Sequence, residues 1–164
     1  MDIKEASEFA SLFWPKFAVH DGLVFLDFAD WNTTRDASTF PDRTAIESFL
    51  NHIHVLDLFS HEASMDEEPY WNTCHPHFTI ACDIGRSFAQ SWAHKLSLEF
   101  PDRRFRVYFT RDDNPVVRFH QMHDGEPPWL EREQNDRVLD DDAVLIVDVC
   151  RGSETDRSGS RSHR

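Results

Sequence analysis

The sequence lacks the glycine-rich and catalytic motifs by which several large enzyme classes are recognised. It has only 5 glycines among 164 residues, and neither a G-x-G-x-x-G nor a G-x-x-x-x-G-K-S/T run occurs, so the loops that hold dinucleotides and triphosphates are missing. The G-x-S-x-G nucleophile elbow and the H-E-x-x-H zinc motif are also absent. These absences favour a non-enzymatic role.

The sequence also lacks a long apolar segment and a set of cysteines that could all pair. No run of about 18 apolar residues is present, which excludes the usual transmembrane helix. The first residues include Asp2, Glu5 and Glu8, so the basic start of a signal peptide is missing. The 3 cysteines form no C-x-x-C and leave at least one thiol unpaired, which is typical of a reducing compartment. We therefore expect a cytoplasmic protein.

Positive charge is scarce. The chain has 17 Lys and Arg against 30 Asp and Glu, which gives a net charge of −13. This balance argues against binding to nucleic acid or to an anionic membrane surface. The acidic excess lies on both sides of residues 101–123, a segment that carries more basic than acidic side chains.

The residues that are present follow the pattern of a folded α+β domain. Hydrophobic residues make up 40% of the chain and recur at helical spacing in some segments and at strand spacing in others. The predicted helices are residues 4–14, 41–52 and 80–98, and the predicted strands are residues 23–28, both halves of a hairpin at 104–121, and residues 143–149. We expect a mostly antiparallel sheet packed against these helices, with strand 143–149 in its centre.

Three further stretches complete the predicted layout. Residues 53–59 fit either the end of the preceding helix or a short strand, and residues 60–77 are expected to form the longest loop. Residues 151–164 contain no apolar side chain, so they can bury nothing to offset the entropy of ordering. The sequence therefore predicts a single domain over residues 1–150 followed by a disordered polar tail.

Histidine is abundant, with 10 in the chain, and two pairs have the form His-x-His. The pairs are His52 with His54 and His75 with His77, and Cys74 adjoins the second pair. Side chains two apart in an extended segment point to the same side, so each pair could present two imidazoles to one ion. These five residues are the candidate ligands of a divalent metal such as zinc or iron.

A metal site would need at least a third ligand, which His61, Glu62, Cys74 or Asp57 could supply. If one coordination position stayed open, the metal could activate a water molecule, which suggests a metal-dependent hydrolase. The alternative is a polar loop without metal. A helix through His52 and His54 would turn them apart, and surface imidazoles are common in loops.

The hairpin at 104–121 has one basic face. Alternation turns its Phe and Val side chains toward the core, which leaves polar side chains together on the other face. These candidate anion-binding residues are Arg104, Arg106, Tyr108, Arg118 and His120. Because guanidinium groups bind carboxylate or phosphate in two-point geometry, a small anionic ligand is a second hypothesis.

Internal ion pairing is the alternative for these arginines. The triplet at residues 140–142 and the acidic segment at residues 66–68 could satisfy them, as could an acidic helix face. Internal pairing and anion binding are compatible if acidic side chains pair with the arginines in the free protein and a ligand displaces them.

The third hypothesis starts from the acidic charge and the tryptophans expected in loops. Trp71 and Trp129 are large aromatic side chains of the kind that anchor a protein partner. Asp66, Glu67 and Glu68 lie close to Trp71 in the sequence. With the net charge of −13, this pattern favours a small acidic module that binds a basic protein, as an inhibitor or an immunity protein does. The sequence favours this function, with the metal site and the anion site as alternatives.

Overall fold

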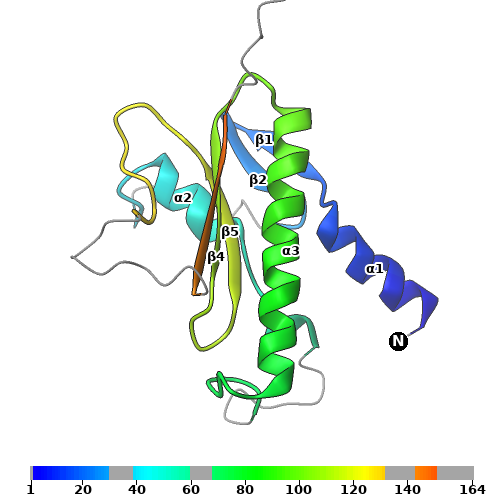
Figure 1. Ribbon diagram of the computed structural model, residues 1–164. Coiled ribbons are helices and arrows are strands. Elements are labelled where there is room, and N and C mark those ends of the chain that lie inside the picture. Colours follow the sequence, from blue (N-terminus) through cyan, green and yellow to red (C-terminus); the bar gives the residue numbers. More distant parts are fainter. Residues whose placement is uncertain (1, 30–38, 60–67, 132–142, 151–164) are drawn as a thin grey trace, which may run out of the picture.

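A four-stranded antiparallel sheet lies at the centre of the molecule, and a long helix, α3, runs along one of its faces (Figure 1). The computed structural model describes residues 2–29, 39–59, 68–131 and 143–150. The helices are α1 (Ile3–Phe13), α2 (Arg43–Leu50) and α3 (Pro76–Glu99), with a 3-10 helix at Leu56–Phe59; the strands are β1 (Phe17–His20), β2 (Leu23–Leu26), β3 (His52–His54), β4 (Phe105–Thr110), β5 (Val116–Gln121) and β6 (Val144–Val149). The predicted α+β class is confirmed.

The predicted hairpin forms the middle of the sheet, whose strand order is β3-β5-β4-β6. Strands β4 and β5 pair antiparallel, with Phe105 opposite Gln121 at one end and Thr110 opposite Val116 at the other. The apolar side chains of alternate positions are buried in the core, as the sequence pattern predicts. The opposite face of the hairpin carries the polar side chains, and we call it the outer face.

Helix α3 supplies the other half of the core. Its side chains Phe88 and Trp92 are fully buried. At Gly85 an added Cβ would lie 2.8 Å from the ring of Phe109, so glycine allows the helix to approach β4 this closely. The helix begins earlier than the predicted 80–98, because His75 caps its first turn and proline is favoured there. Within the described ranges, no helix is both long and apolar enough to span a membrane.

Two predicted elements differ from the structure. Helix 41–52 is shorter, because Asn51 ends α2 and the next residue starts β3, which pairs with β5. The stretch 53–59 therefore contains a short strand and then the 3-10 helix. Strand 143–149 was expected in the centre of the sheet and is wrong in that respect, because β6 lies at the edge beside β4. Its apolar side chains are explained by its packing against α3.

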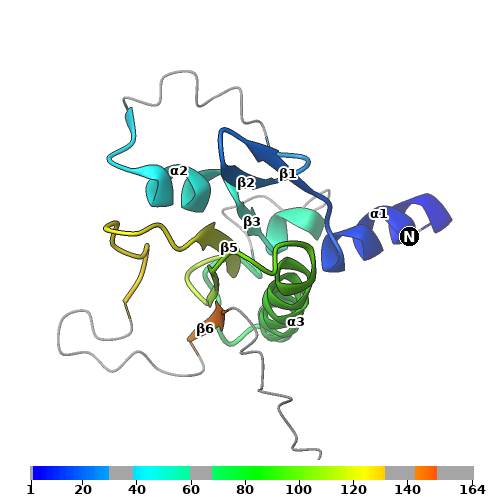
Figure 2. The ribbon, with the colours of Figure 1, turned by 90° about the horizontal axis from the view of Figure 1, so that it is seen from above.

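The strand predicted at residues 23–28 ends at Leu26 and pairs with β1, which the sequence analysis did not predict. Figure 2 shows this β1–β2 hairpin beside α2, close to β3 and β5 and away from β6. The predicted tail at residues 151–164 lies outside the described residues, so the extent of the single domain stays a prediction.

Two buried polar side chains connect the β1–β2 hairpin to the main sheet. Glu47 accepts hydrogen bonds from the backbone N–H of Val24 at 2.7 Å and of Gln121 at 2.8 Å. Asn51 accepts one from the N–H of Leu26 at 2.9 Å and donates one to the carbonyl of Val24 at 2.7 Å. Backbone groups at the facing edges of β2 and β5 are therefore satisfied by side chains of α2 and its C-cap.

Candidate functional site

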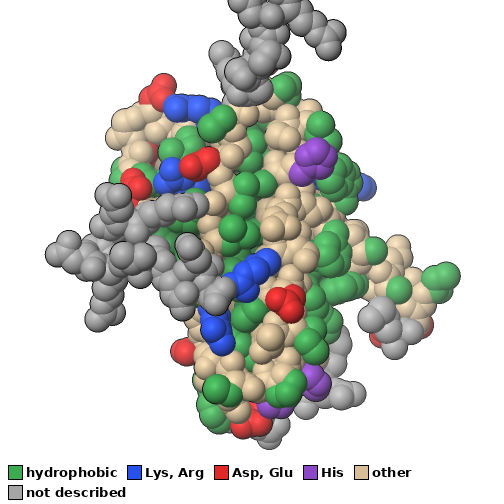
Figure 3. All heavy atoms as spheres, viewed as in Figure 1, with side chains coloured by type: hydrophobic (Ala, Val, Ile, Leu, Met, Phe, Trp, Pro, Cys, Tyr) green, Lys and Arg blue, Asp and Glu red, His purple; other side chains and the backbone are tan. Residues whose placement is uncertain are grey.

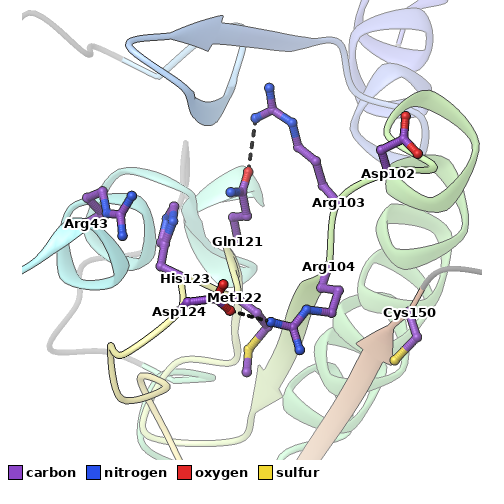
Figure 4. A pocket seen from close by; sticks show the side chains of 9 residues that line it. All are labelled: Arg43, Asp102, Arg103, Arg104, Gln121, Met122, His123, Asp124 and Cys150. Carbon is purple, nitrogen blue, oxygen red and sulfur yellow. Dashed lines mark hydrogen bonds and ion pairs between the residues drawn. The ribbon is translucent and has the colours of Figure 1, made fainter.

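A cavity of about 590 Å³ lies at the end of the sheet where β4 begins and where β5 and β6 end. Figure 4 shows side chains from several elements around it, including the start of α2 and the turn that follows α3. The ionisable groups that line this end cavity are Arg43, Asp102, Arg103, Arg104, His123 and Asp124, and Cys150 adds a free thiol.

Arg103 differs from the other arginines of the end cavity because its hydrogen-bond partners are neutral. Its Nη1 donates to the carbonyl of Gly22 at 2.9 Å and to Oε1 of Gln121 at 3.0 Å, the second of which is dashed in Figure 4. Among the described residues, no carboxylate pairs with Arg103. Its positive charge is therefore held in place by dipoles and is not neutralised by an ion pair.

The other two arginines of the end cavity form ion pairs with one turn of the chain. Arg104 Nη2 lies 2.8 Å from Oδ1 of Asp124, and Arg43 Nε lies 2.6 Å from Oε1 of Glu126. Gly125 between the two acids has a φ of +82°, a left-handed conformation that glycine adopts without strain. Both arginine side chains are about half exposed, at 55% for Arg104 and 54% for Arg43.

A buried histidine–carboxylate pair forms another wall. His123 Nε2 lies 2.9 Å from Oε2 of Glu47, whose side chain is fully buried. This contact and the two backbone N–H groups bonded to Glu47 hold the carboxylate from three directions. Among the described residues, Nδ1 of His123 has no hydrogen-bond partner. Glu47 thus orients the imidazole by accepting from its Nε2–H, which leaves Nδ1 as an acceptor.

The outer face holds the predicted anion-binding residues other than Arg104, and its arginines have internal partners. Arg106 pairs with Asp148 at 2.6 Å and with Glu131 at 3.7 Å. Arg118 stacks on the ring of Trp129, with 3.8 Å from the guanidinium carbon to the ring centroid. Internal pairing thus accounts for Arg106, through acids other than the two acidic segments expected from the sequence.

Tyr108 and His120 are buried together on the outer face. The hydroxyl of Tyr108 lies 2.8 Å from Nε2 of His120, and the two rings stack with their centroids 5.5 Å apart. Burial raises the pKa of Tyr108 to about 12, and burial lowers the pKa of His120 below its ordinary value. The neutral forms of both side chains are therefore favoured, and the edge of Trp129 covers Tyr108.

The His-x-His pairs are each brought together. The ring centroids of His52 and His54 are 5.1 Å apart on β3, and those of His75 and His77 are 5.0 Å apart at the start of α3. Cys74 is exposed beside the second pair. In the parts of the chain that the structure describes, no three His, Cys, Asp or Glu side chains are grouped to hold a metal ion. The metal hypothesis stays a prediction. Two of the candidates for its third ligand, at residues 61 and 62, lie outside the described residues.

The residues predicted to bind a protein partner do not form one described surface. Trp71 is 54% exposed, and its backbone N–H donates to Asp113 at the tip of the hairpin. Trp129 packs instead on the outer face, where Arg118 covers its ring. Glu68 accepts a hydrogen bond from Asn72. Asp66 and Glu67 lie outside the described residues.

Sequence reasoning missed Arg43, Arg103, Glu47 and His123 as site residues. Arg103 was the most accessible of them to pattern analysis, because it adjoins Arg104 in the net-basic segment. Glu47 gave no signal of its burial, because a Glu next to an apolar residue such as Ile46 is ordinary in an amphipathic helix. His123 carried no signal either, because its partner is 76 positions away.

The comparisons with known proteins give a family and no activity. The sequence model of the Uncharacterized protein PM0498 family matches residues 4–158. Neither a curated protein nor a solved structure matches the chain.

Proposed function

The chain belongs to the Uncharacterized protein PM0498 family, and we propose that it binds a small anionic ligand, carrying a phosphate or a carboxylate, in the end cavity. The observation that carries this proposal is the convergence of Arg43, Arg103 and Arg104 on one cavity beside the oriented imidazole of His123. Guanidinium groups supply the paired N–H donors that a phosphate or carboxylate accepts.

The size of the end cavity suits an organic ligand. Its volume of about 590 Å³ falls in the usual range of small-molecule sites, which is about 300–1,000 Å³. The partners of Arg103 support the proposal, because its guanidinium donates to two neutral oxygens and not to a carboxylate. An incoming anion would gain a charge-assisted hydrogen bond there without breaking an ion pair.

The surface around the end cavity does not form a large basic field. Figure 3 shows basic and acidic side chains next to one another at the upper left of the molecule, where this end of the sheet lies. A steered encounter with a polyanion such as nucleic acid is therefore not part of the proposal. The proposed ligand is small and is selected by contact geometry.

The basic protein partner and the cytoplasmic location remain proposals of lower rank. The net charge of −13 suits such a partner, and all three cysteines are unpaired, as expected in a reducing compartment. No contact among the described residues favours a protein partner over a small anion.

Titration calorimetry with inorganic phosphate tests the proposal, with chloride at equal ionic strength as the salt control. We expect saturable binding to the parent chain and a loss of about 10- to 100-fold in affinity for Arg103→Ala, because one charge-assisted hydrogen bond is worth about 1.5–3 kcal/mol. The matched controls are Arg106→Ala on the outer face and Arg111→Ala at the far end of the hairpin, and both should bind as the parent does.

Two results would contradict the proposal. Heat changes that phosphate and chloride produce equally would show that the protein has no anion site. A loss of affinity in Arg106→Ala and not in Arg103→Ala would place the site on the outer face instead.

A further inference from the structure

The two ion pairs at the rim of the end cavity differ in how firmly they are held. In the pair between Arg104 and Asp124, the side chains are 55% and 95% exposed. Exposed pairs of this kind contribute about 0.2–1 kcal/mol, because water screens both charges. Asp124 is therefore a partner that Arg104 can exchange.

The pair between Arg43 and Glu126 is built into the fold. The side chain of Glu126 is 15% exposed, and its Oε2 also accepts from the backbone N–H of Thr44 at 2.8 Å and from the Thr44 hydroxyl at 3.0 Å. Burial alone would raise the pKa of Glu126, but the hydrogen bonds from Arg43 and Thr44 outweigh it and lower this pKa. Glu126 thus anchors its loop to the first turn of α2.

The loop that carries both acids keeps Asp124 close to Arg104. Glu126 is fixed on α2, and Gly125 allows the chain to turn between the two acids. Asp124 is thereby tethered beside Arg104 while its own side chain stays in water. A tethered group acts at a high effective concentration even when its contact is weak.

On the basis of the proposed function, we propose that the anionic group of the ligand replaces Asp124 at Arg104, and that Asp124 is a built-in competitor that sets the affinity. Arg103, the preceding residue in the chain, lines the same end cavity, and Figure 4 shows its guanidinium directed toward Gln121 while that of Arg104 is directed toward Asp124. Arg43 stays paired with Glu126 during this exchange. The anion seat therefore lies at Arg104, in the cavity that Arg103 also lines, and Asp124 occupies it in the free protein.

Asp124→Asn tests this proposal, because it removes the competing charge with little change in shape. We expect orthophosphate to bind about two- to fivefold more tightly, which corresponds to losing an exposed ion pair worth about 0.2–1 kcal/mol. The matched control is Asp102→Asn, which removes the same charge from the lining of the same cavity. Its gain should be smaller, because the carboxylate paired with Arg104 is that of Asp124.

A second comparison ties the effect to Arg104. In a chain that already carries Arg104→Ala, we expect Asp124→Asn to raise the affinity for orthophosphate no more than Asp102→Asn does in the parent, because no pair remains to be broken. Urea unfolding of each variant shows whether it folds as the parent does.

The possible outcomes separate this proposal from the proposed function. Equal gains in the two acid variants, no gain in Asp124→Asn, or an undiminished gain from Asp124→Asn in the Arg104→Ala chain would each overturn the role of Asp124 and leave anion binding intact. Absence of orthophosphate binding in both the parent chain and Asp124→Asn would contradict the proposed function itself.

Discussion

The outer face and the end cavity belong to the same sheet and contain the same kinds of side chain, yet they differ in what those side chains contact. On the outer face, Arg106 is held by Asp148 and Arg118 is covered by Trp129. In the end cavity, Arg103 has neutral partners, and Arg104 has an acid that is almost wholly in water. The proposed function rests on this difference, because a ligand must displace each internal partner of an arginine before it can bind there.

The largest expected loss of stability comes from replacing Glu47. This fully buried side chain holds His123, which lines the end cavity. Glu47→Ala leaves the N–H groups of Val24 and Gln121 and the imidazole of His123 without their acceptor. We expect a loss of about 3–5 kcal/mol in the free energy of unfolding, measured by urea denaturation at pH 7.5.

Two further variants make the Glu47 measurement specific. Glu47→Gln keeps one acceptor oxygen, so its loss should be smaller, at about 1–3 kcal/mol. Glu99→Ala removes a partly exposed partner of Lys95 and should cost at most about 1 kcal/mol. A loss below 1 kcal/mol for Glu47→Ala would mean that the backbone edges of β2 and β5 find other partners.

An intermediate effect is expected from Arg118, whose role should be structural in contrast to that of Arg103. Arg118→Ala removes the guanidinium stacked on Trp129, and we expect it to cost about 2 kcal/mol in the same unfolding assay. Arg118→Met keeps much of the packing and sheds the buried charge, so it should stay within about 1 kcal/mol of the parent. Arg103→Ala should also stay within about 1 kcal/mol while losing anion affinity. If Arg103→Ala proved the more destabilising of the two alanine variants, the contrast between the two regions would be wrong.

The smallest expected effect is a dependence of stability on pH that arises next to the outer face. Burial lowers the pKa values of His120 and His52 in the folded state, so between each lowered value and the unfolded value near 6.5 the unfolded chain binds more protons. The free energy of unfolding should therefore fall as the pH drops below about 6.5. Urea denaturation from pH 7.5 to 5.5 measures this slope. We expect His120→Gln to flatten it and His94→Gln, at an exposed position, to leave it unchanged.

Local patterns predicted most of the fold. The alternation in residues 104–121 predicted the hairpin and the faces of the side chains within β4 and β5, because strand geometry depends on adjacent residues; Arg104, which precedes β4, lies at the end cavity instead. The predicted central position of strand 143–149 was wrong. An apolar run indicates that a strand is buried, but it does not show whether strands on both sides or a helix packed on one face buries it. Strand β3 was predicted only as one of two alternatives for residues 53–59, and His52 was placed in the helix, because three strand residues that follow a helix carry no turn signal.

The candidate site was predictable only in part. Arg104 was identified, but the other members of the end cavity come from α2, from the turn after α3, from the end of β5 and the loop after it, and from the end of β6. Tertiary packing alone brings Glu47 to His123 and Glu126 to Arg43. The composition of the chain decided that acids outnumber bases, and the alternation of its strands decided which arginines share a face. Which of those arginines are neutralised was decided by the fold, because ion pairing depends on distances between segments far apart in the chain.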